Sequence, residues 1–373
     1  MNFNTSALTF AKLESILREK PLLELAPEIV AKMQGEKVSP EQASIADVYL
    51  EAHLVSFASE LPEEIIRLAL ALQISGLVNK TDSPVSGAVM NRLLAFHNRE
   101  VFPIVHKQSP EKSLLAQLSN PLIGRGKVRF QGYELNAADV MDIFSWEPLN
   151  LSPSEVQTLL NTQSFTLAFL SHSLVNIKPY QEWFTYSMQV FQQIATTEEQ
   201  EQNSAVTLVD AFQNLQNALE AEIASGNPEF LAEKELSIFV SKLSQVVQVI
   251  AAYTEETFTN LVATSEPPAL STFSLTRDLA QQLNQKARIG NIGQVKTSGL
   301  LEHLENLVKT TEQVVALAFW SISQVGKVFN LASENLALAA YYHSDFYVPK
   351  ELVSTQLDNI LRFTRTHSAP TLT

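Results

Sequence analysis

The stretch Ser298-Gly-Leu-Leu-Glu-His-Leu-Glu-Asn-Leu-Val308 begins a run that continues to Tyr342 without a proline and with only two glycines. Its apolar residues recur every three or four positions, which is the spacing of one buried helix face. They are Leu300, Leu301, Leu304, Leu307, Val308, Val314 and Val315. One continuous helix over this run would be roughly 65 Å long at 1.5 Å per residue. Polar residues between the apolar ones exclude a membrane span, so the run predicts a helix that needs partners along its whole length.

Two further blocks have the same character. Residues 154–196 are interrupted only by Pro179, and residues 204–262 only near Ser225-Gly-Asn-Pro228. The first hundred residues predict shorter helices, among them an amphipathic one over residues 65–78. Glycines around Val128 and Phe130 predict a small β-hairpin within residues 121–135. The sequence therefore predicts an all-α protein with an N-terminal helical region over residues 1–150 and a long-helix bundle over residues 151–373, forming one continuous structural unit.

Composition excludes several classes of function. The chain has 373 residues, a formal net charge of −14 and no cysteine. The acidic balance argues against nucleic-acid binding, and the missing cysteines exclude disulfides, thiolate metal sites and cysteine nucleophiles. The seven histidines are scattered, with no pair at metal-ligand spacing beside a carboxylate, so we expect no metal site. Without a signal sequence or an apolar stretch of about 18–20 residues, we expect a cytoplasmic protein that does not bind membranes.

Six stretches follow, in order, the pattern of one known family. They are Glu51-Ala-His53, 61–68, 91–105, 122–128, 148–152 and 159–166. In this order and spacing, residues 49–175 resemble the aromatic amino acid ammonia-lyase family of histidine and phenylalanine ammonia-lyases. The resemblance implies an all-α fold with a homotetrameric helix bundle. We accordingly expect a homo-oligomer, a tetramer or a dimer.

Members of that family carry an Ala-Ser-Gly triplet that cyclises into a methylidene-imidazolone electrophile. In the corresponding place this chain reads Gln108-Ser-Pro-Glu-Lys-Ser-Leu-Leu-Ala-Gln-Leu-Ser-Asn120, without the triplet. The family's glycine-rich loop with its general-base tyrosine is also missing, since Tyr49 lies in a helical pattern. Ammonia elimination removes a weakly acidic β-proton, and ordinary acid–base groups contribute only about 10²–10⁴-fold. We therefore expect no conventional ammonia-lyase activity and no cofactor.

The resemblance carries four candidate site residues. His53 falls on the histidine of the family's Arg-Ser-His sequence and is a candidate catalytic acid or base. Asn161 is the second catalytic candidate, because it falls on the asparagine that lies beside the electrophile and helps its formation. Thr162 replaces the glycine after it, and a helix-capping or packing role is the alternative. Gln163 is a candidate substrate-binding residue. Arg277, in an echo of the family's Tyr-Ser-x-Arg segment, is a candidate for holding a carboxylate through a bidentate pair.

Two functions stay open at this point. The first is an enzyme or binding protein that reuses the family pocket for a small amino-acid-like or aromatic metabolite. The second is a non-catalytic helical scaffold or partner subunit, a pseudoenzyme. The space bounded by residues 103–123 and 161–166 discriminates between them, because converging polar groups would favour the first and packed apolar side chains the second.

Overall fold

The computed structural model describes most of the chain. The described residues are 2–3, 8–33, 38–54, 59–80, 83–107, 110–194, 202–227, 229–264, 269–288, 297–329, 341–342, 344–346 and 352–369. The chain divides into two compact units: unit 1 comprises residues 1–172 and 216–232, and unit 2 comprises residues 173–215 and 233–373.

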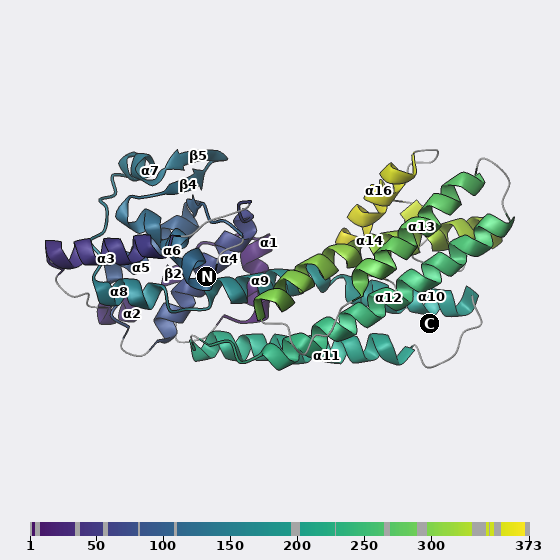
Figure 1. Cartoon of the computed structure of the whole chain (residues 1–373), viewed down its shortest axis with the longest axis horizontal. Helices are drawn as coiled ribbons and strands as arrows, with labels where there is room; N and C mark the ends of the chain where they lie inside the picture. Colours follow the sequence, from purple (N-terminus) through teal and green to yellow (C-terminus); the bar gives the residue numbers. More distant parts are fainter. Residues whose placement is uncertain are drawn as a thin grey trace. The chain divides into compact units, whose positions relative to one another are not determined.

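Unit 1 is a set of short helices with two small sheets (Figure 1). Its helices are α1 (Phe10–Arg18), α2 (Pro27–Lys32), α3 (Pro40–Ala52), α4 (Glu63–Asn79), α5 (Gly87–Asn98), α6 (Glu111–Ser119), the 3₁₀ helix η1 (Asn120–Ile123), α7 (Ala137–Phe144) and α8 (Pro153–Leu159). Its strands are β1 (Asn2–Phe3), β2 (Glu24–Leu25), β3 (Phe102–Pro103), β4 (Lys127–Phe130) and β5 (Tyr133–Asn136). Helices α9 (Ser164–Ile177) and α11 (Gln202–Ser225) contribute residues to both units.

Helix α4 is the centre of unit 1. The predicted helix over residues 65–78 is present, but the expected amphipathic character is wrong, because α4 is buried on all sides from Ile65 to Ser75. Its polar side chains are therefore paired inside the protein. Arg67 forms an ion pair with Glu100 at 2.6 Å and lies over the ring of Phe102. A helix that is buried on all sides is a core helix, so the other elements of unit 1 pack around α4.

The predicted hairpin is confirmed as β4 and β5, with β3 pairing antiparallel to the outer side of β4. Phe130 pairs with Tyr133, so the connection contains two residues, Gln131 and Gly132, with φ of 51° and 81°. Two consecutive left-handed residues form the turn type whose twist matches that of the flanking strands. This turn chemistry is why so short a hairpin forms.

Unit 2 is a bundle of long helices. It contains α10 (Tyr180–Ile194), α12 (Glu233–Thr264), α13 (Ala269–Ala287), α14 (Thr297–Phe329) and α16 (Val353–Thr366). Helix α12 packs against α13 and α14, and α14 packs against α10 and α16. The predicted long helix is confirmed from residue 297 to residue 329, whereas residues 330–340 lie outside the described part. The predicted break in the block over residues 204–262 is also confirmed, since α11 ends at Ser225 and α12 begins at Glu233.

A cluster of aromatic side chains fills the middle of unit 2. Trp183 of α10 meets the ring of Phe319 of α14 edge-on, at a centroid distance of 5.3 Å. Phe363 of α16 adds a third ring, 6.0 Å from Trp183. The indole nitrogen of Trp183 donates to the carbonyl of Thr364 at 3.0 Å, so the polar end of this buried ring is satisfied. The all-α, long-helix architecture predicted from the sequence is thereby present.

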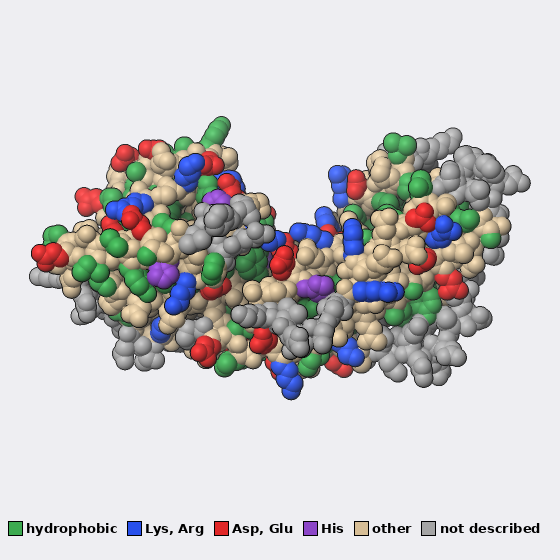
Figure 2. All heavy atoms as spheres, viewed as in Figure 1, with side chains coloured by type: hydrophobic (Ala, Val, Ile, Leu, Met, Phe, Trp, Pro, Cys, Tyr) green, Lys and Arg blue, Asp and Glu red, His purple; other side chains and the backbone are tan. Residues whose placement is uncertain are grey.

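Helix α12 is strongly apolar, and most of the described charged side chains lie at the surface. By length and composition alone α12 is apolar enough to cross a bilayer, but 56% of the relevant stretch is buried inside the structure. A buried core helix of a bundle has the same composition. Acidic and basic side chains are interspersed over the face shown in Figure 2.

Candidate functional site

Gln73 of α4 fixes the loop that leads into α9. The side chain is fully buried, and its Nε2 donates to the carbonyl of Leu159 at 3.0 Å. Its Oε1 accepts from the hydroxyls of Thr162, at 2.6 Å, and Ser164. One glutamine thus satisfies a free carbonyl at the end of α8 and two hydroxyls at the start of α9. Residues 160–164 are held in place by these bonds.

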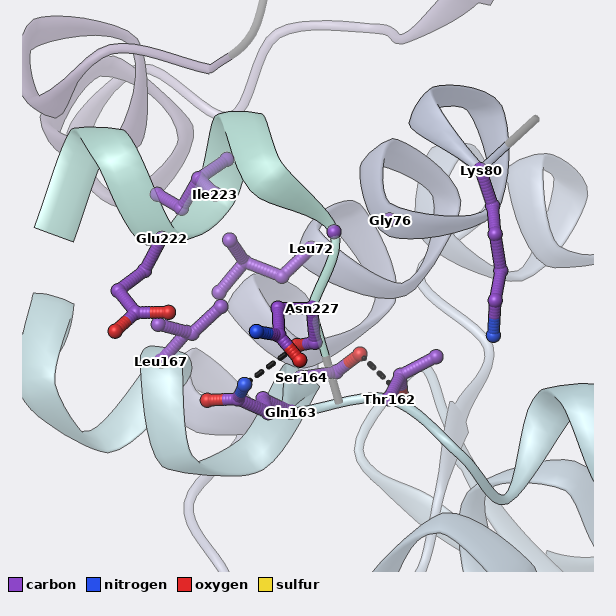
Figure 3. A pocket seen from close by; sticks show the side chains of 11 residues that line it. Leu72, Gly76, Lys80, Thr162, Gln163, Ser164, Leu167, Glu222, Ile223 and Asn227 are labelled. Atoms are coloured by element: carbon purple, nitrogen blue, oxygen red, sulfur yellow. Dashed lines mark hydrogen bonds between the residues drawn. The ribbon is translucent and has the colours of Figure 1, made fainter. Parts of the chain in front are cut away.

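A small pocket lies beside this loop, within unit 1 (Figure 3). It is lined by residues of α4 and its C-cap, of the loop before α9 and the first turn of α9, and of the end of α11 and the turn after it: Leu72, Gly76, Lys80, Thr162, Gln163, Ser164, Leu167, Glu222, Ile223, Gly226 and Asn227. The cavity measures about 20 Å³, which is room for about one water-sized group. Figure 3 shows the Glu222 carboxylate and the Gln163 amide together on one side, with Lys80 at the other.

Glu222 is the only carboxylate among the described residues that line this pocket. It is 6% exposed, and its Oε1 accepts from the backbone N–H groups of Leu231 at 2.5 Å and Ala232 at 2.7 Å. Glu222 therefore holds the turn between α11 and α12 in place. Its Oε2 is buried and has no hydrogen-bond partner in the described part of the chain. A buried carboxylate oxygen without a hydrogen bond is costly, so this atom can accept from a donor that the described chain does not supply.

Gln163 has the same deficit. It is 6% exposed; its Nε2 donates to the carbonyl of Asn227, while its Oε1 is buried without a partner among the described residues. The candidate substrate-binding role of Gln163 stays a prediction, but the structure places the side chain in the pocket. The other three candidates do not line it.

Asn161 and His53 lie at the surface of unit 1. Asn161 is exposed, and its backbone N–H donates to the carbonyl of Thr158 at 3.2 Å. His53 follows α3, and its Nδ1 lies 2.9 Å from the carbonyl oxygen of Tyr49. No hydrogen bond joins His53 to Asn161 or Gln163 in the part of the chain that the structure describes. Tyr49 lies on α3, as its helical pattern indicates.

Arg277 lies on α13, in unit 2. Its guanidinium pairs with the neighbouring Asp278, with Nη2 to Oδ1 at 3.0 Å. The side chain is 35% exposed, so part of its donor set remains accessible to an anion. Its proposed role in holding a carboxylate remains a prediction.

The segment that the resemblance implies for the electrophile, residues 108–120, forms α6 and the start of η1; its first two residues, 108 and 109, lie outside the described part. From Ser113 to Ile123 every side chain is buried, including Leu114, Leu115 and Leu118. At the start of α6 the Glu111 carboxylate accepts from Phe165 N at 2.9 Å, Thr166 N at 3.2 Å and Thr166 Oγ1 at 3.0 Å. It thereby caps the start of α9, where the positive end of the helix dipole favours an anion. Burial raises the pKa of Glu111 to about 7, although these hydrogen bonds favour the ionised form.

An Ala-Ser-Gly triplet does occur elsewhere in the chain, outside the segment that the family pattern indicates. Ala224-Ser-Gly226 is an Ala-Ser-Gly triplet, and Gly226 lines the pocket. Ala224 and Ser225 are the last helical residues of α11, and Gly226 has a φ of 59°. The Ser225 hydroxyl donates to the carbonyl of Glu222 at 2.9 Å and accepts from Asn227 N at 3.1 Å. A left-handed glycine after a helix is a common helix terminator, which accounts for the triplet at this position.

Comparison with known proteins agrees with the resemblance seen in the sequence. The sequence model of the family described as aromatic amino acid lyase matches residues 30–218, about half of the chain. The chain belongs to the aromatic amino acid lyase family. Histidine ammonia-lyase of Shewanella oneidensis is 28% identical over 194 residues, covering 43% of this chain and 38% of that enzyme. Histidine ammonia-lyase of Geobacillus thermodenitrificans is 33% identical over 123 residues, covering 31% of this chain and 24% of that enzyme.

The match to these lyases thus spans less than two fifths of their length.

Solved structures share the fold over almost the whole chain. Tyrosine aminomutase from Streptomyces globisporus superposes with a TM-score of 0.81 at 12% identity, over 98% of this chain and 97% of that one. Histidine ammonia-lyase from Trypanosoma cruzi superposes with a TM-score of 0.78 at 14% identity, over 98% of this chain and 93% of that one. At such low identity these likenesses concern the fold alone.

Proposed function

We propose that this member of the aromatic amino acid lyase family binds a small amino-acid-like metabolite and does not eliminate ammonia from it. The observation that carries the proposal is the buried α6–η1 segment, which contains no Ala-Ser-Gly triplet and which the resemblance implies as the counterpart of the electrophile segment. Without a strong electrophile, the weakly acidic β-proton of an aromatic amino acid is not activated for removal. The protein acts in the cytoplasm as a homo-oligomer in this proposal.

The pocket supports the ligand class. Lys80 and Glu222 place one cationic and one anionic side chain along the same pocket, which is the charge pattern of a zwitterionic ligand. The enclosed space is small, so only the charged part of such a ligand is buried. His53, Asn161 and Arg277 stay candidates for contacts outside this pocket.

The alternative is a non-catalytic scaffold or partner subunit. The packing of residues 113–123 favours it, because every side chain there is buried and most of them are apolar. The polar groups beside Gln163 favour the binding function instead. A panel of amino acids and amines, tested for stabilisation of the protein against heat, separates the two, since a scaffold without a ligand site responds to none of them.

Two measurements test the missing elimination. Incubation with phenylalanine, tyrosine or histidine should yield no ultraviolet-absorbing acrylate, while an active histidine ammonia-lyase run in parallel yields urocanate. The intact mass should equal that of the unmodified chain. Cyclisation at Ala224-Ser-Gly226 would remove two water molecules, so a peptide covering residues 224–226 that lacks this mass would overturn the proposal.

A further inference from the structure

We propose that Glu222 and Gln163 form a binding site for a small ammonium group. The inference rests on the proposed function in one respect, because it names the chemical group that the same pocket holds; it does not depend on whether ammonia is eliminated. Two buried oxygens, Oε2 of Glu222 and Oε1 of Gln163, line one pocket and lack a partner in the described chain. Both need a hydrogen-bond donor, and one of them carries negative charge.

The size of the cavity sets the size of the donor. About 20 Å³ accommodates one water-sized group, and an ammonium ion or the –NH₃⁺ head of an amine is of that size. A neutral water molecule would satisfy the hydrogen bonds but would leave the carboxylate charge uncompensated. An ammonium group satisfies both requirements, with charge-assisted hydrogen bonds.

The hydroxyl oxygens of Thr162 and Ser164, on either side of Gln163, can also accept hydrogen bonds. Thr162 and Ser164 both donate to Oε1 of Gln73, whose Nε2 is committed to the carbonyl of Leu159. The two hydroxyl oxygens also lie 3.0 Å from each other, which uses at most one lone pair, so each keeps at least one lone pair open on the wall of the pocket. The described wall thus presents acceptors next to one carboxylate, which is the environment of a cationic donor.

Two other cations, a calcium ion and the ammonium group of Lys80 itself, fit the unpartnered oxygens less well. A calcium ion takes six to eight oxygen ligands, commonly with several carboxylates. Here a single described carboxylate lines the pocket, and one of its oxygens already accepts two backbone N–H groups. Lys80 lines the same pocket, but Figure 3 shows its side chain on the opposite side from Glu222.

The test measures thermal unfolding and ¹⁵N-ammonium NMR of the full chain. Ammonium chloride should raise the melting temperature more than sodium, potassium or tetramethylammonium chloride at equal ionic strength. Bound ¹⁵N-ammonium should give a signal that exchanges slowly with the free ion. A response to methylammonium as well identifies the head group of an amine as the ligand, whereas a response to ammonium alone identifies the free ion.

Three variants make the test specific. Glu222→Gln removes the charge but keeps an oxygen for Leu231 and Ala232, and we expect its ammonium affinity to fall about tenfold or more. Gln163→Met removes the other acceptor and should also weaken binding, which keeps the proposal testable if Glu222→Gln does not fold. Glu229→Gln, at an exposed carboxylate on the same turn, should bind as the wild type does.

Two outcomes overturn the inference. The first is an equal response to all the salts, or an undiminished ammonium response in Glu222→Gln, which would mean that the cavity holds only water. The second is a potassium response as large as the ammonium response, which would mean that hydrogen-bond donation is not what the site selects. Neither outcome bears on whether phenylalanine, tyrosine or histidine is deaminated.

Discussion

Glu111 gives the protein a pH-dependent stability. Its pKa rises from an ordinary 4.5 to about 7 on folding, so the folded state holds a proton that the unfolded state has released. The sign follows from linkage: this contribution to stability is fully present below pH 4.5 and is lost as the pH rises through about 7. We expect Glu111→Gln to remove this loss, worth about 1–3 kcal/mol between the two limits. Urea unfolding at a series of pH values measures how the free energy of unfolding changes with pH in the wild type and in Glu111→Gln.

His97 provides the internal control, because its effect has the opposite sign. It is 1% exposed, and burial lowers its pKa from 6.5 to about 4. Its contribution is present above pH 6.5 and is lost as the pH falls through about 4. In the wild type the two slopes oppose each other, whereas in Glu111→Gln stability should rise with pH up to about 6.5. Identical pH profiles for the two proteins would contradict the assignment to Glu111.

Gln73 is the residue on which the loop beside the pocket depends. Gln73→Leu has nearly the same volume but leaves the carbonyl of Leu159 and the hydroxyls of Thr162 and Ser164 without their partner. We expect it to lower the free energy of unfolding by about 2–4 kcal/mol, because buried groups lose hydrogen bonds. Gln157→Leu, the same change at an exposed position of α8, should stay within about 0.5 kcal/mol. Equal unfolding midpoints for the two variants would argue against this role.

At the scale of elements, Phe319 joins three helices of unit 2. Its ring contacts Trp183 of α10 and Phe363 of α16, and the side chain is completely buried. Phe319→Ala should cost about 3–5 kcal/mol through lost burial and the cavity left behind. Near-ultraviolet circular dichroism follows the loss of the fixed environment of Trp183. Leu275→Ala on α13, where the leucine is 71% exposed, should have little effect on stability. A small effect of Phe319→Ala would show that the cluster is not essential to the bundle.

The elements also show what a sequence can and cannot predict. Helices α12 and α14 follow from their apolar spacing, and the hairpin follows from its glycines. Helix α13 was not predicted, because its proline-containing approach indicates a break and its surface is mostly polar. The prediction that α4 is amphipathic was wrong. Spacing alone does not reveal that Arg67 and Gln73 are buried with partners from elsewhere in the chain.

The site was less predictable than the fold for a related reason. Gln163 was a candidate because of its place in the family pattern, but Glu222, which lines the same pocket, is far away in the sequence and follows no motif. A carboxylate with one satisfied and one unsatisfied oxygen is recognisable only when its hydrogen bonds are known. The Ala224-Ser-Gly226 triplet shows the reverse case: it is visible in the sequence, and its location at a helix end gives it a structural reason to be there.

At the scale of the whole molecule, α3 is the helix on which we expect the proposed homo-oligomer to form a contact. This helix exposes Ile45 (60%), Val48 (63%) and Tyr49 (40%), which are three or four positions apart or adjacent and so share one face. Apolar residues grouped on one helix face are costly in water and are covered in an assembly. A second copy of this chain is the occupant that a homo-oligomer requires.

Light scattering after size exclusion tests the assembly. The wild type should have a mass of two or four times 41.4 kDa. Val48→Asp should shift it toward the single chain, because a charge would be buried in the contact without a partner. Leu352→Asp, at an apolar residue that is 77% exposed on another element, should leave the mass unchanged. A wild-type mass of one chain would refute the expected homo-oligomer, and an unchanged oligomer in Val48→Asp would move the contact away from α3. Because Val48 lies far in the sequence from Glu222 and Gln163, a monomeric Val48→Asp that still responds to ammonium would show that the ammonium site is complete within one chain.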